Sequence, residues 1–439
     1  MRVIIIGAGV SGLSLYLWLD KLGLTKAHDI TIYERRPDVS LDNGSEISIV
    51  GGSIGITANG MRVIHTLDEQ LFAEVVQAGH RINSWRISTA RGWTLADAPT
   101  GGPGDDSVMI GREDFCRCFR KRVPESVTKV KKVLDVEIGS TVNVLKFDDG
   151  SSAEADLVVG ADGIWSILRR IMFGVQSNAK DYQYAPHYEG LVGVGSYVPA
   201  NLMQEVPQGQ MNIVLGRNGF FGYGIDRGES ATSKVARGVC WSTYTLDVLP
   251  QDWRKLDCDQ AQQQLRARHQ HWKNDVIRRI IKEVKIDQVW PTFTTPLLPS
   301  WERQGCVLMG DAAHAVQPSS GQGTSMALED AEALARLLAH HLAVDPRSGH
   351  LLACKQYSDL RMPRLAKVHK KAQQLGSMKQ DMGVVQELVM YAFVWALAKC
   401  SWGKSYNEYV FRYDVGTEVE HAISTGRKQE QLHLAHEDF

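Results

Sequence analysis

Hydrophobic residues in this chain fall into short runs and helical repeats whose order predicts an α/β architecture. The apolar run at residues 3–6 predicts a buried strand, and the apolar positions within residues 13–22 predict a helix directly after it. A second strand is expected at residues 30–33. Similar runs at residues 157–160 and 306–309 predict two further buried strands much later in the chain. We therefore expect one Rossmann-like nucleotide-binding domain that is interrupted by other structure.

Antiparallel strands and hairpins are expected between these runs, because apolar and polar residues alternate there and turn residues separate them. The pattern predicts a nucleotide-binding domain at residues 1–179 and 286–350, and a mostly antiparallel β-sheet domain at residues 180–285. A hairpin over residues 80–97 is expected to join the side of the sheet domain. Residues 351–439 are expected to form a helical C-terminal region.

The most apolar stretch near the C-terminus, residues 384–400, is shorter than the roughly 20 residues that a transmembrane helix needs. It also contains Gln386, Glu387 and Lys399. We favour a buried helix. The alternative is a helix that packs on a partner subunit or lies on a membrane surface.

A glycine-rich turn follows the first strand and opens the first helix. Gly7 allows the tight turn, Gly9 lets the backbone approach a pyrophosphate, and Gly12 lets the helix pack on the strand. The unpaired N–H groups at the start of the helix favour phosphate. Glu34 ends the second strand. Its separation in sequence from the glycine turn is about that expected of a carboxylate that accepts hydrogen bonds from ribose hydroxyls. This segment predicts a dinucleotide site.

A second cradle lies nearly three hundred residues later, in residues 310–331. Asp311 follows a strand, Pro318 interrupts the chain, and a turn with Gly321 and Gly323 leads through Thr324 into a helix. Strand, acidic loop, glycine turn and helix together favour polyol and phosphate groups. Two cradles so far apart predict one long cofactor that is held at both ends.

Composition narrows the function classes. The chain has 439 residues, of which 44% are apolar and 23% charged, and its net charge is −1. These values are typical of a soluble globular protein and do not indicate a nucleic-acid partner. The seven cysteines show no metal-like spacing, and the first strand begins too early to leave room for a signal peptide. We expect a cytoplasmic protein without a metal site.

Three linked signatures resemble the group A FAD-dependent aromatic monooxygenases, the superfamily of para-hydroxybenzoate hydroxylase and salicylate hydroxylase. They are the glycine turn with Glu34, the GADGIWS motif at residues 160–166 with Arg169, and the segment from Gly310 to Asp330. All three occur in the order and at the spacing of that family. The resemblance extends from residue 1 to about residue 370.

The resemblance implies FAD bound non-covalently, with NADPH or NADH binding transiently. It implies that Glu34 holds the adenosine ribose and that Arg112 reaches the FAD. Asp162 is implied in FAD and nicotinamide function, and Asp311 in contact with the ribityl or pyrophosphate region. The turn at residues 321–324 is implied to offer backbone N–H groups to the flavin pyrimidine edge, where negative charge grows on reduction.

The resemblance also implies a reaction. NAD(P)H reduces FAD, O2 adds to give a flavin C4a-hydroperoxide, and one oxygen atom passes to an organic substrate by hydroxylation or epoxidation. The aromatic-rich sheet is expected to keep water out, and Pro318 is expected beside the flavin. Tyr223 is a candidate for orienting a substrate hydroxyl, although a tyrosine packed in the sheet core explains the same residue equally well.

The sequence departs from the family pattern at the first strand of the substrate sheet. Many relatives carry an arginine there, whereas residues 188–195 read YEGLVGVG, with glycine or valine in its place. We expect a roomier, less polar pocket and a mid-sized aromatic or alkaloid-like secondary metabolite as substrate. Baeyer–Villiger oxidation, reduction or dehydrogenation on the same fold stays an alternative, as does a non-catalytic flavin redox sensor. A monomer or a homodimer is expected.

Overall fold

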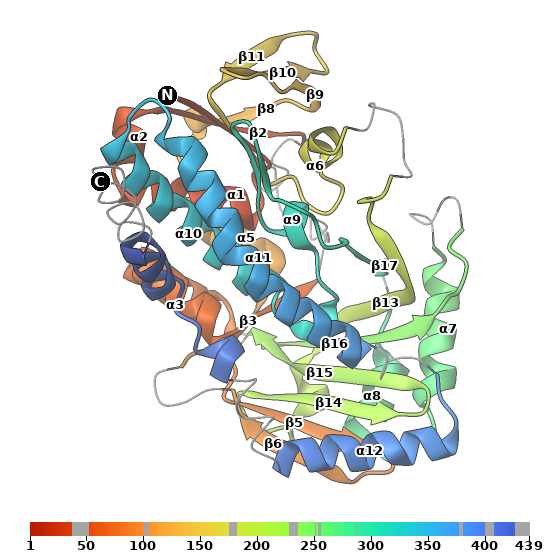
Figure 1. Cartoon of the computed structure of the whole chain (residues 1–439). Helices are drawn as coiled ribbons and strands as arrows, with labels where there is room; N and C mark the ends of the chain where they lie inside the picture. The colour runs from red at the N-terminus through yellow and green to blue at the C-terminus, as the bar shows by residue number, and fades with distance from the viewer. Residues whose placement is uncertain are drawn as a thin grey trace, which may run out of the picture.

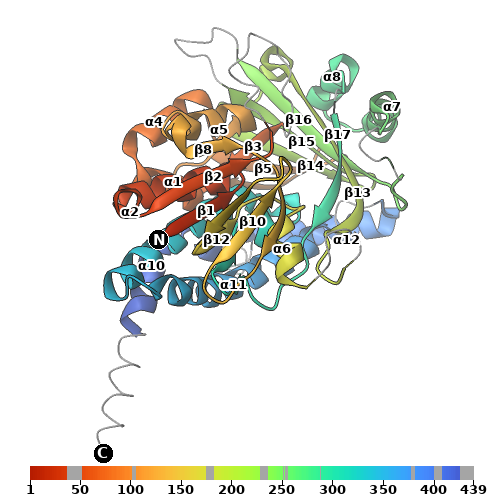
Figure 2. The same cartoon turned by 90° about the horizontal axis from the view of Figure 1, so that it is seen from above.

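The structure is a computed structural model that describes residues 1–36, 52–100, 105–174, 182–227, 236–250, 252, 256–286, 288–376, 381–399 and 408–425. A helix-rich half that contains the N-terminus adjoins a half built around a large sheet (Figures 1 and 2).

A six-stranded sheet forms the centre of the N-terminal half, in the order β18-β19-β12-β1-β2-β8. Its strands are β1 (Arg2–Ile6), β2 (Asp29–Glu34), β8 (Thr128–Val130), β12 (Leu157–Gly160), β18 (Glu302–Arg303) and β19 (Cys306–Leu308). β1 pairs in parallel with β2 and β12, and β12 pairs in parallel with β19. Distant stretches of sequence thus share one sheet, which confirms the Rossmann-like arrangement that the apolar runs predicted.

Helices pack on this sheet and on one another through apolar sides. α10 (Gly323–Val344) contacts α1 (Val10–Lys21), α3 (Ala58–Leu67) and α11 (Gly349–Gly376). The side of α1 that carries Leu15 and Trp18 is fully buried. The shorter helices of this half are α2 (Leu24–Ala27), α4 (Glu69–Ala78), α5 (Arg112–Arg120), α6 (Ile167–Met172) and α9 (Asp311–His314).

Two three-stranded sheets accompany the central one. One contains β9 (Val133–Glu137), β10 (Asn143–Phe147) and β11 (Ser152–Ala155). The other contains β3 (Ser53–Ile56), β4 (His80–Arg81) and β7 (Val108–Gly111), and it adjoins the large sheet through contacts of β7 with β15 (Gly219–Arg227).

The large sheet has seven strands in the order β17-β13-β16-β15-β14-β5-β6. Besides β15, they are β5 (Ser84–Thr89), β6 (Thr94–Pro99), β13 (His187–Pro199), β14 (Gln210–Gly216), β16 (Arg237–Thr245) and β17 (Gln288–Thr294). All neighbours are antiparallel except β14 and β5. The expected hairpin near residues 80–97 therefore lies in this sheet, and so does β17, which falls within the range expected for the nucleotide-binding domain.

The two faces of the large sheet have different coverings. α7 (Cys258–His269) and α8 (Asp275–Glu283) cover the outer face, where Val214, Phe221 and Ile277 share one apolar core. The inner face points toward the N-terminal half, and Met211 and Val239 pack there against Met109 of β7. A ligand between the two halves would therefore meet the inner face.

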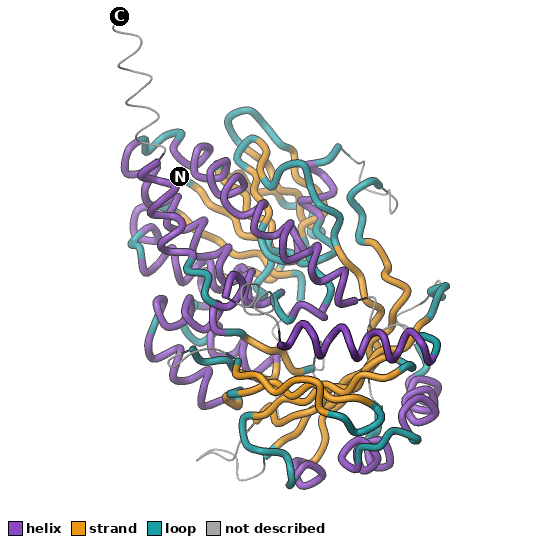
Figure 3. Tube along the Cα trace, turned by 60° about the horizontal axis from the view of Figure 1, so that its bottom comes forward, coloured by secondary structure: helices purple, strands orange, loops and turns teal. Residues whose placement is uncertain are grey.

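The C-terminal region is helical, as the sequence predicted. α12 (Val384–Lys399) lies along the large sheet beside β6, at the outside of the molecule (Figures 1 and 3). Residues 415–425 form a further helix. In the described part of the chain no helix is both long and apolar enough to cross a membrane.

Candidate cofactor site and substrate face

The glycine turn after β1 has the geometry of a phosphate cradle. Gly7 has a φ of +106°, and a Cβ there would lie 2.4 Å from the carbonyl oxygen of Ala161. A Cβ at Gly12 would lie 2.0 Å from the carbonyl oxygen of Gly7. Gly9 at the start of α1 has open space where a side chain would be. Side chains are excluded where backbone must pack, and room is left where a pyrophosphate would approach the helix N-terminus.

Glu34 lies beside this turn, at the end of β2. Its Oε2 accepts a hydrogen bond from the backbone N–H of Ala8 at 2.9 Å, and its Oε1 accepts one from Arg36 at 3.0 Å. Two backbone donors hold the carboxylate at the mouth of the cradle. This placement fits the binding of ribose hydroxyls.

The second cradle touches the first. Gly310 has a φ of +57°, and a Cβ there would lie only 2.2 Å from Oγ of Ser11 in the first helical turn of α1. Asp311 follows as an exposed residue at the start of α9. Two motifs about three hundred residues apart in sequence are therefore in contact, as a single cofactor bound to both requires.

Arg169 and Asp162 organise the loop that follows β12. The buried Arg169 donates from Nη1 to the carbonyl of Ala312 at 2.7 Å and from Nη2 to that of Ile164, so it ties this loop to α9. Asp162 accepts at Oδ2 from the backbone N–H of Ile167 at 2.7 Å. Its Oδ1 is buried without a hydrogen-bond partner among the described residues, and burial raises the pKa of this carboxyl. An unpartnered buried acceptor is what a bound donor group would satisfy.

A network of buried charges supports the second cradle from below. Asp330 Oδ2 accepts from the backbone N–H of Gly310 at 2.9 Å and is paired with His314. Asp330 Oδ1 accepts from Nε of Arg361 at 2.8 Å. Burial alone would raise the pKa of Asp330, but His314 and Arg361 lower it to about 2. Asp330 is therefore an anion that fixes the loop, and His314 is a structural residue of this network.

The network continues to the turn at residues 321–324, which we call the flavin-side turn, through residues that the sequence analysis did not identify. Glu329 pairs with both Arg361 and Arg364 at 2.7 Å and accepts from Asn59. Asn59 donates to the side chain of Gln322, which is buried between the two predicted glycines. Local sequence patterns gave no sign of the contacts of Asn59, because they join residues more than 260 positions apart.

The turn itself is open on its other side. Gly321 has a φ of +61°, and a Cβ at Gly321 or Gly323 would meet no atom within 4 Å. α10 begins at Gly323, so Thr324 lies in its first turn, where backbone N–H groups lack helical partners. The exposed Pro318 begins a short 3-10 helix before the turn. This arrangement fits the stabilisation of negative charge on a flavin ring.

Arg112 starts α5, directly after β7. Its backbone N–H donates to the carbonyl of Gly52 at 3.0 Å, and its side chain is exposed. Ser53 begins the neighbouring strand β3 and donates to Asp226 of the large sheet at 3.0 Å. Arg112 thus lies where the cofactor half meets the large sheet.

Tyr223, the candidate for orienting a substrate hydroxyl, is buried within the apolar core of the large sheet. Along β15, alternate residues point to opposite faces, and Tyr223 points with Phe221 to the outer face. Its hydroxyl accepts a hydrogen bond from Asn274, the N-cap of α8, at 3.2 Å. Tyr223 is therefore a core residue under the helices, the alternative that the sequence left open.

Two tryptophans cover glycines on the inner face instead. A Cβ at Gly222 would lie 2.2 Å from the indole of Trp241. A Cβ at Gly193 would lie 2.3 Å, and one at Gly195 3.0 Å, from the indole of Trp290. The indole of Trp290 therefore stands over the stretch of β13 where the family pattern has an arginine and this chain has glycine or valine. Glycines on the neighbouring strands make room for these rings.

Arg237 lies on the inner face and is already paired. Arg237 binds Asp226 through two hydrogen bonds of 3.0 and 2.7 Å, and its guanidinium stacks on Tyr197 at 3.8 Å from the ring centroid. Asp226 is fully buried, so its charge requires this partner. Arg237 is therefore a structural cation at the junction of the two halves.

A polar contact joins β13 to the segment at residues 315–320, which leads into the flavin-side turn and which we call the flavin-side loop. Glu189 accepts hydrogen bonds from Nε2 of Gln317 at 2.6 Å and from the hydroxyl of Thr294. The pairing of β13 with β17 shifts register next to Gly190, which has a φ of +70°. This bulge lies beside Glu189, whose carboxylate meets the residue that precedes Pro318.

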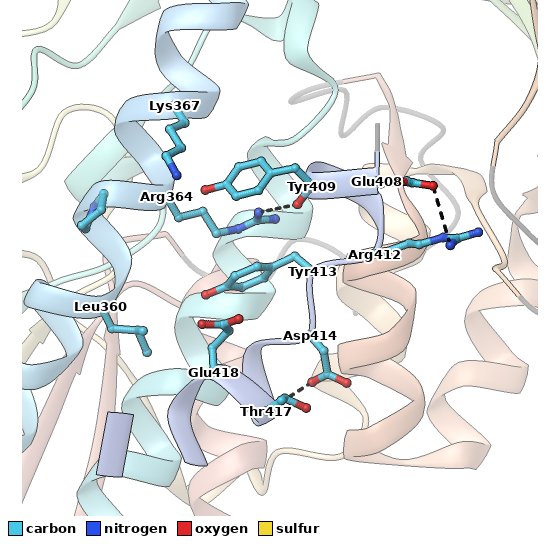
Figure 4. A pocket seen from close by; sticks show the side chains of 11 residues that line it. Leu360, Arg364, Lys367, Glu408, Tyr409, Arg412, Tyr413, Asp414, Thr417 and Glu418 are labelled. Carbon is cyan, nitrogen blue, oxygen red and sulfur yellow. Dashed lines mark hydrogen bonds and ion pairs between the residues drawn. The ribbon is translucent and has the colours of Figure 1, made fainter. Parts of the chain in front are cut away.

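A cavity of about 470 Å³ lies elsewhere, between α11 and residues 408–418 (Figure 4). The guanidinium of Arg364 stacks on Tyr413 at 3.6 Å, and Arg364 also donates to the carbonyls of Tyr409 and Val410. None of the predicted site residues lines this cavity. Its residues fasten the C-terminal segment over the Arg364–Glu329 pair. Among the described residues, no cluster of histidine, cysteine or acidic side chains could hold a metal ion.

Comparison with known proteins agrees with this geometry. Residues 124–372 match the FAD binding domain family. The chain is 30% identical to 3-amino-4-hydroxybenzoate 2-monooxygenase of Streptomyces cremeus, over 85% of this chain and 86% of that protein. Among solved structures, a salicylate hydroxylase substrate complex aligns with a TM-score of 0.75 at 20% identity, over 96% of this chain and 98% of that one. Klebsiella pneumoniae HpxO complexed with FAD and uric acid aligns with a TM-score of 0.71 at 19% identity, over 97% of each chain. The cofactor is FAD, and the chain belongs to the group A FAD-dependent aromatic monooxygenases.

Proposed function

We propose that this monooxygenase hydroxylates or epoxidises a mid-sized, uncharged aromatic substrate that lies on the inner face of the large sheet. The observation that carries this proposal is the pair of indoles, Trp241 and Trp290, above the glycines of β13 and β15. An indole offers a large, rigid apolar surface, and a stacked aromatic pair contributes about 0.5–1.5 kcal/mol beyond burial. A flat apolar ring system suits this surface.

Charge on the inner face supports an uncharged substrate. Arg237 is compensated by the buried Asp226. On β13, the inner-face positions 193 and 195 are glycines, which carry no charged side chain. A substrate carboxylate bound over these residues would lose water without gaining a free cation, and burying an unpaired charge is costly. We therefore disfavour small aromatic acids.

The cofactor residues have separate roles in this proposal. When bound, FAD accepts electrons from NADPH or NADH and delivers one oxygen atom of O2 to the substrate. Glu34 binds the ribose hydroxyls, and the N-termini of α1 and α10 bind the pyrophosphate and the flavin edge. Asp162, Asp311 and Arg112 complete the cofactor contacts. Pro318, held through its neighbour Gln317, excludes water beside the ring.

Oxygen consumption and product analysis test the proposal. NADPH and NADH oxidation are measured under air with neutral polycyclic aromatics and with their carboxylated analogues, and peroxide is quantified. We expect neutral compounds to stimulate reduction and to gain one atom from ¹⁸O2, with less peroxide formed. Stimulation by the acids alone would refute the substrate class. Absence of flavin reduction by either nicotinamide would leave a flavin-binding redox sensor, and a lactone product would indicate Baeyer–Villiger oxidation.

Two variants connect the assay to the indoles. Trp290→Leu is expected to raise KM for the neutral substrate by about 10-fold through lost stacking and area. Tyr223→Phe is the matched control, because it removes one hydroxyl on the outer face of the same sheet. Equal KM values in both variants would contradict binding on the inner face. A cytoplasmic location also stays a proposal, to be tested by cell fractionation.

A further inference from the structure

α12 presents an apolar face that nothing in the described structure covers. Its inner side contacts the large sheet. Glu387 pairs with Arg91 at 2.8 Å, and the hydroxyl of Tyr391 donates to the carbonyl of Leu215 at 3.0 Å. Met390 and Tyr391 are buried against the sheet. The opposite side carries Val385, which is 75% exposed, and Val389, which is 63% exposed.

The exposed side chains form a continuous patch. Residues 385, 389, 392 and 396 follow the helical spacing of one stripe, and the helix is apolar around its whole circumference between residues 388 and 398. A helix of this kind is normally buried on all sides. Trp93, which is 53% exposed on the hairpin next to Tyr391, extends the patch beyond the helix. The members are Trp93, Val384, Val385, Leu388, Val389, Phe393 and Trp395.

We propose that a second copy of this chain covers this patch, so that the enzyme is a two-fold symmetric dimer in which α12 packs against α12 of the partner subunit. The exposed fractions correspond to roughly 700 Å² of apolar surface, close to the ~800 Å² that each partner contributes to a standard stable interface. The largest apolar patch of a typical monomer is only about 300–600 Å². A two-fold axis lets one patch serve both partners.

Charge favours a protein partner over a lipid surface. Interfacial helices combine an apolar side with lysines and arginines that meet anionic lipids. On α12 the single basic residue is Lys399 at its end, and the acidic Glu387 points inward. The whole chain has a net charge of −1. An uncharged patch on a neutral protein suits an identical uncharged patch.

Sedimentation velocity on the FAD-loaded enzyme tests the dimer over about a hundredfold range of concentration. We expect a dimer for the wild type. We expect Val389→Glu to raise the dissociation constant by about 100-fold or more, because a carboxylate at the centre would be buried without a partner. Val344→Glu is the control, since this valine is 73% exposed at the end of α10 and should leave the dimer intact.

Three outcomes would overturn the proposal. A wild type that stays monomeric at every concentration removes it, and so does a dimer that Val389→Glu leaves unchanged. Sedimentation of a monomeric wild type with phosphatidylcholine vesicles, with or without phosphatidylserine, would assign the patch to a lipid surface. The flavin absorbance spectrum and the melting temperature of each variant separate lost association from lost folding.

Discussion

Replacing Arg361 by methionine tests whether the buried charges hold the cofactor loops. Arg361 is fully buried and pairs with Asp330 at 2.8 Å and with Glu329 at 2.7 Å. Methionine keeps an unbranched side chain but removes the charge. Breaking a buried ion pair by removing one partner costs about 3–5 kcal/mol, because the remaining carboxylates lose compensation. At about 2.1 cal/mol/K of unfolding entropy per residue, this loss lowers the Tm of a chain of 439 residues by roughly 3–5 °C.

The assay is a thermal scan of apoprotein and of protein at a fixed excess of FAD, together with an FAD titration followed by flavin fluorescence. Arg278→Met is the matched control: Arg278 pairs with Asp275, and both side chains are more than half exposed, so we expect a loss of about 1 kcal/mol or less. FAD affinity should fall in Arg361→Met alone, since Asp330 fixes the Gly310 loop. Equal Tm values for the two variants would refute the reasoning.

The same ion pairs predict how the effect of Arg361→Met on stability changes with pH. The folded pKa of Asp330, about 2, lies below the ordinary value of 3.8. Its contribution to stability, about 2 kcal/mol, is therefore complete above pH 3.8 and is lost as the pH falls toward 2. Without Arg361 the folded pKa of Asp330 rises. The Tm difference between wild type and Arg361→Met should narrow below about pH 4, and a constant difference would argue against a charge effect.

Three further predictions concern the cofactor loop, the sheet and their junction. Gly310→Ala should weaken FAD binding by about 10-fold or more, because its positive φ and tight contact exclude a side chain. Gly383→Ala should not change the FAD dissociation constant, because a Cβ there would make only an ordinary contact of 3.8 Å with Gln386. Tyr223→Phe should cost about 0.5–1.5 kcal/mol of unfolding free energy and leave kcat within twofold, and a large loss of kcat would restore a catalytic role. Glu189→Ala should increase the peroxide released per NADPH oxidised, because the flavin-side loop loses its tether; unchanged coupling would make that contact purely structural.

The cofactor half could be predicted from sequence because its signals are local. A parallel strand buried on both faces must be apolar along its buried length, as residues 3–6 of β1 and residues 157–159 of β12 are. The glycine turn must exclude side chains at Gly7, whose neighbour across the turn is backbone. Each requirement produces a motif of a few neighbouring residues. The order of three such motifs, the glycine turn and the segments at residues 160–166 and 310–330, was enough to predict the interrupted fold.

The substrate face could not be predicted in the same way. On an antiparallel strand, a shift of one residue exchanges the two faces, so the aromatic cluster of β15 gave no reason to choose Tyr223 over its neighbours. The packing of α8 determines which face Tyr223 occupies, because Asn274, the N-cap of α8, donates a hydrogen bond to the Tyr223 hydroxyl. The inner-face tryptophans are recognisable only when Gly193 and Gly222 are seen beneath them. Such pairs join different strands and have no fixed spacing in sequence.

The polar contacts described above between the two halves involve side chains other than the two indoles of the proposed substrate face. Glu189 reaches the flavin-side loop from the bulge of β13, and Asp226 reaches Ser53 from the end of β15. The indoles of Trp241 and Trp290 stand on glycines of the sheet and carry none of these contacts. The buried charges that hold the cofactor loops lie on α10 and α11, in the N-terminal half. If the proposed substrate face is correct, we therefore expect replacement of an indole to change which substrate fits without loosening the FAD, a separation of functions by which one cofactor fold can serve many substrates.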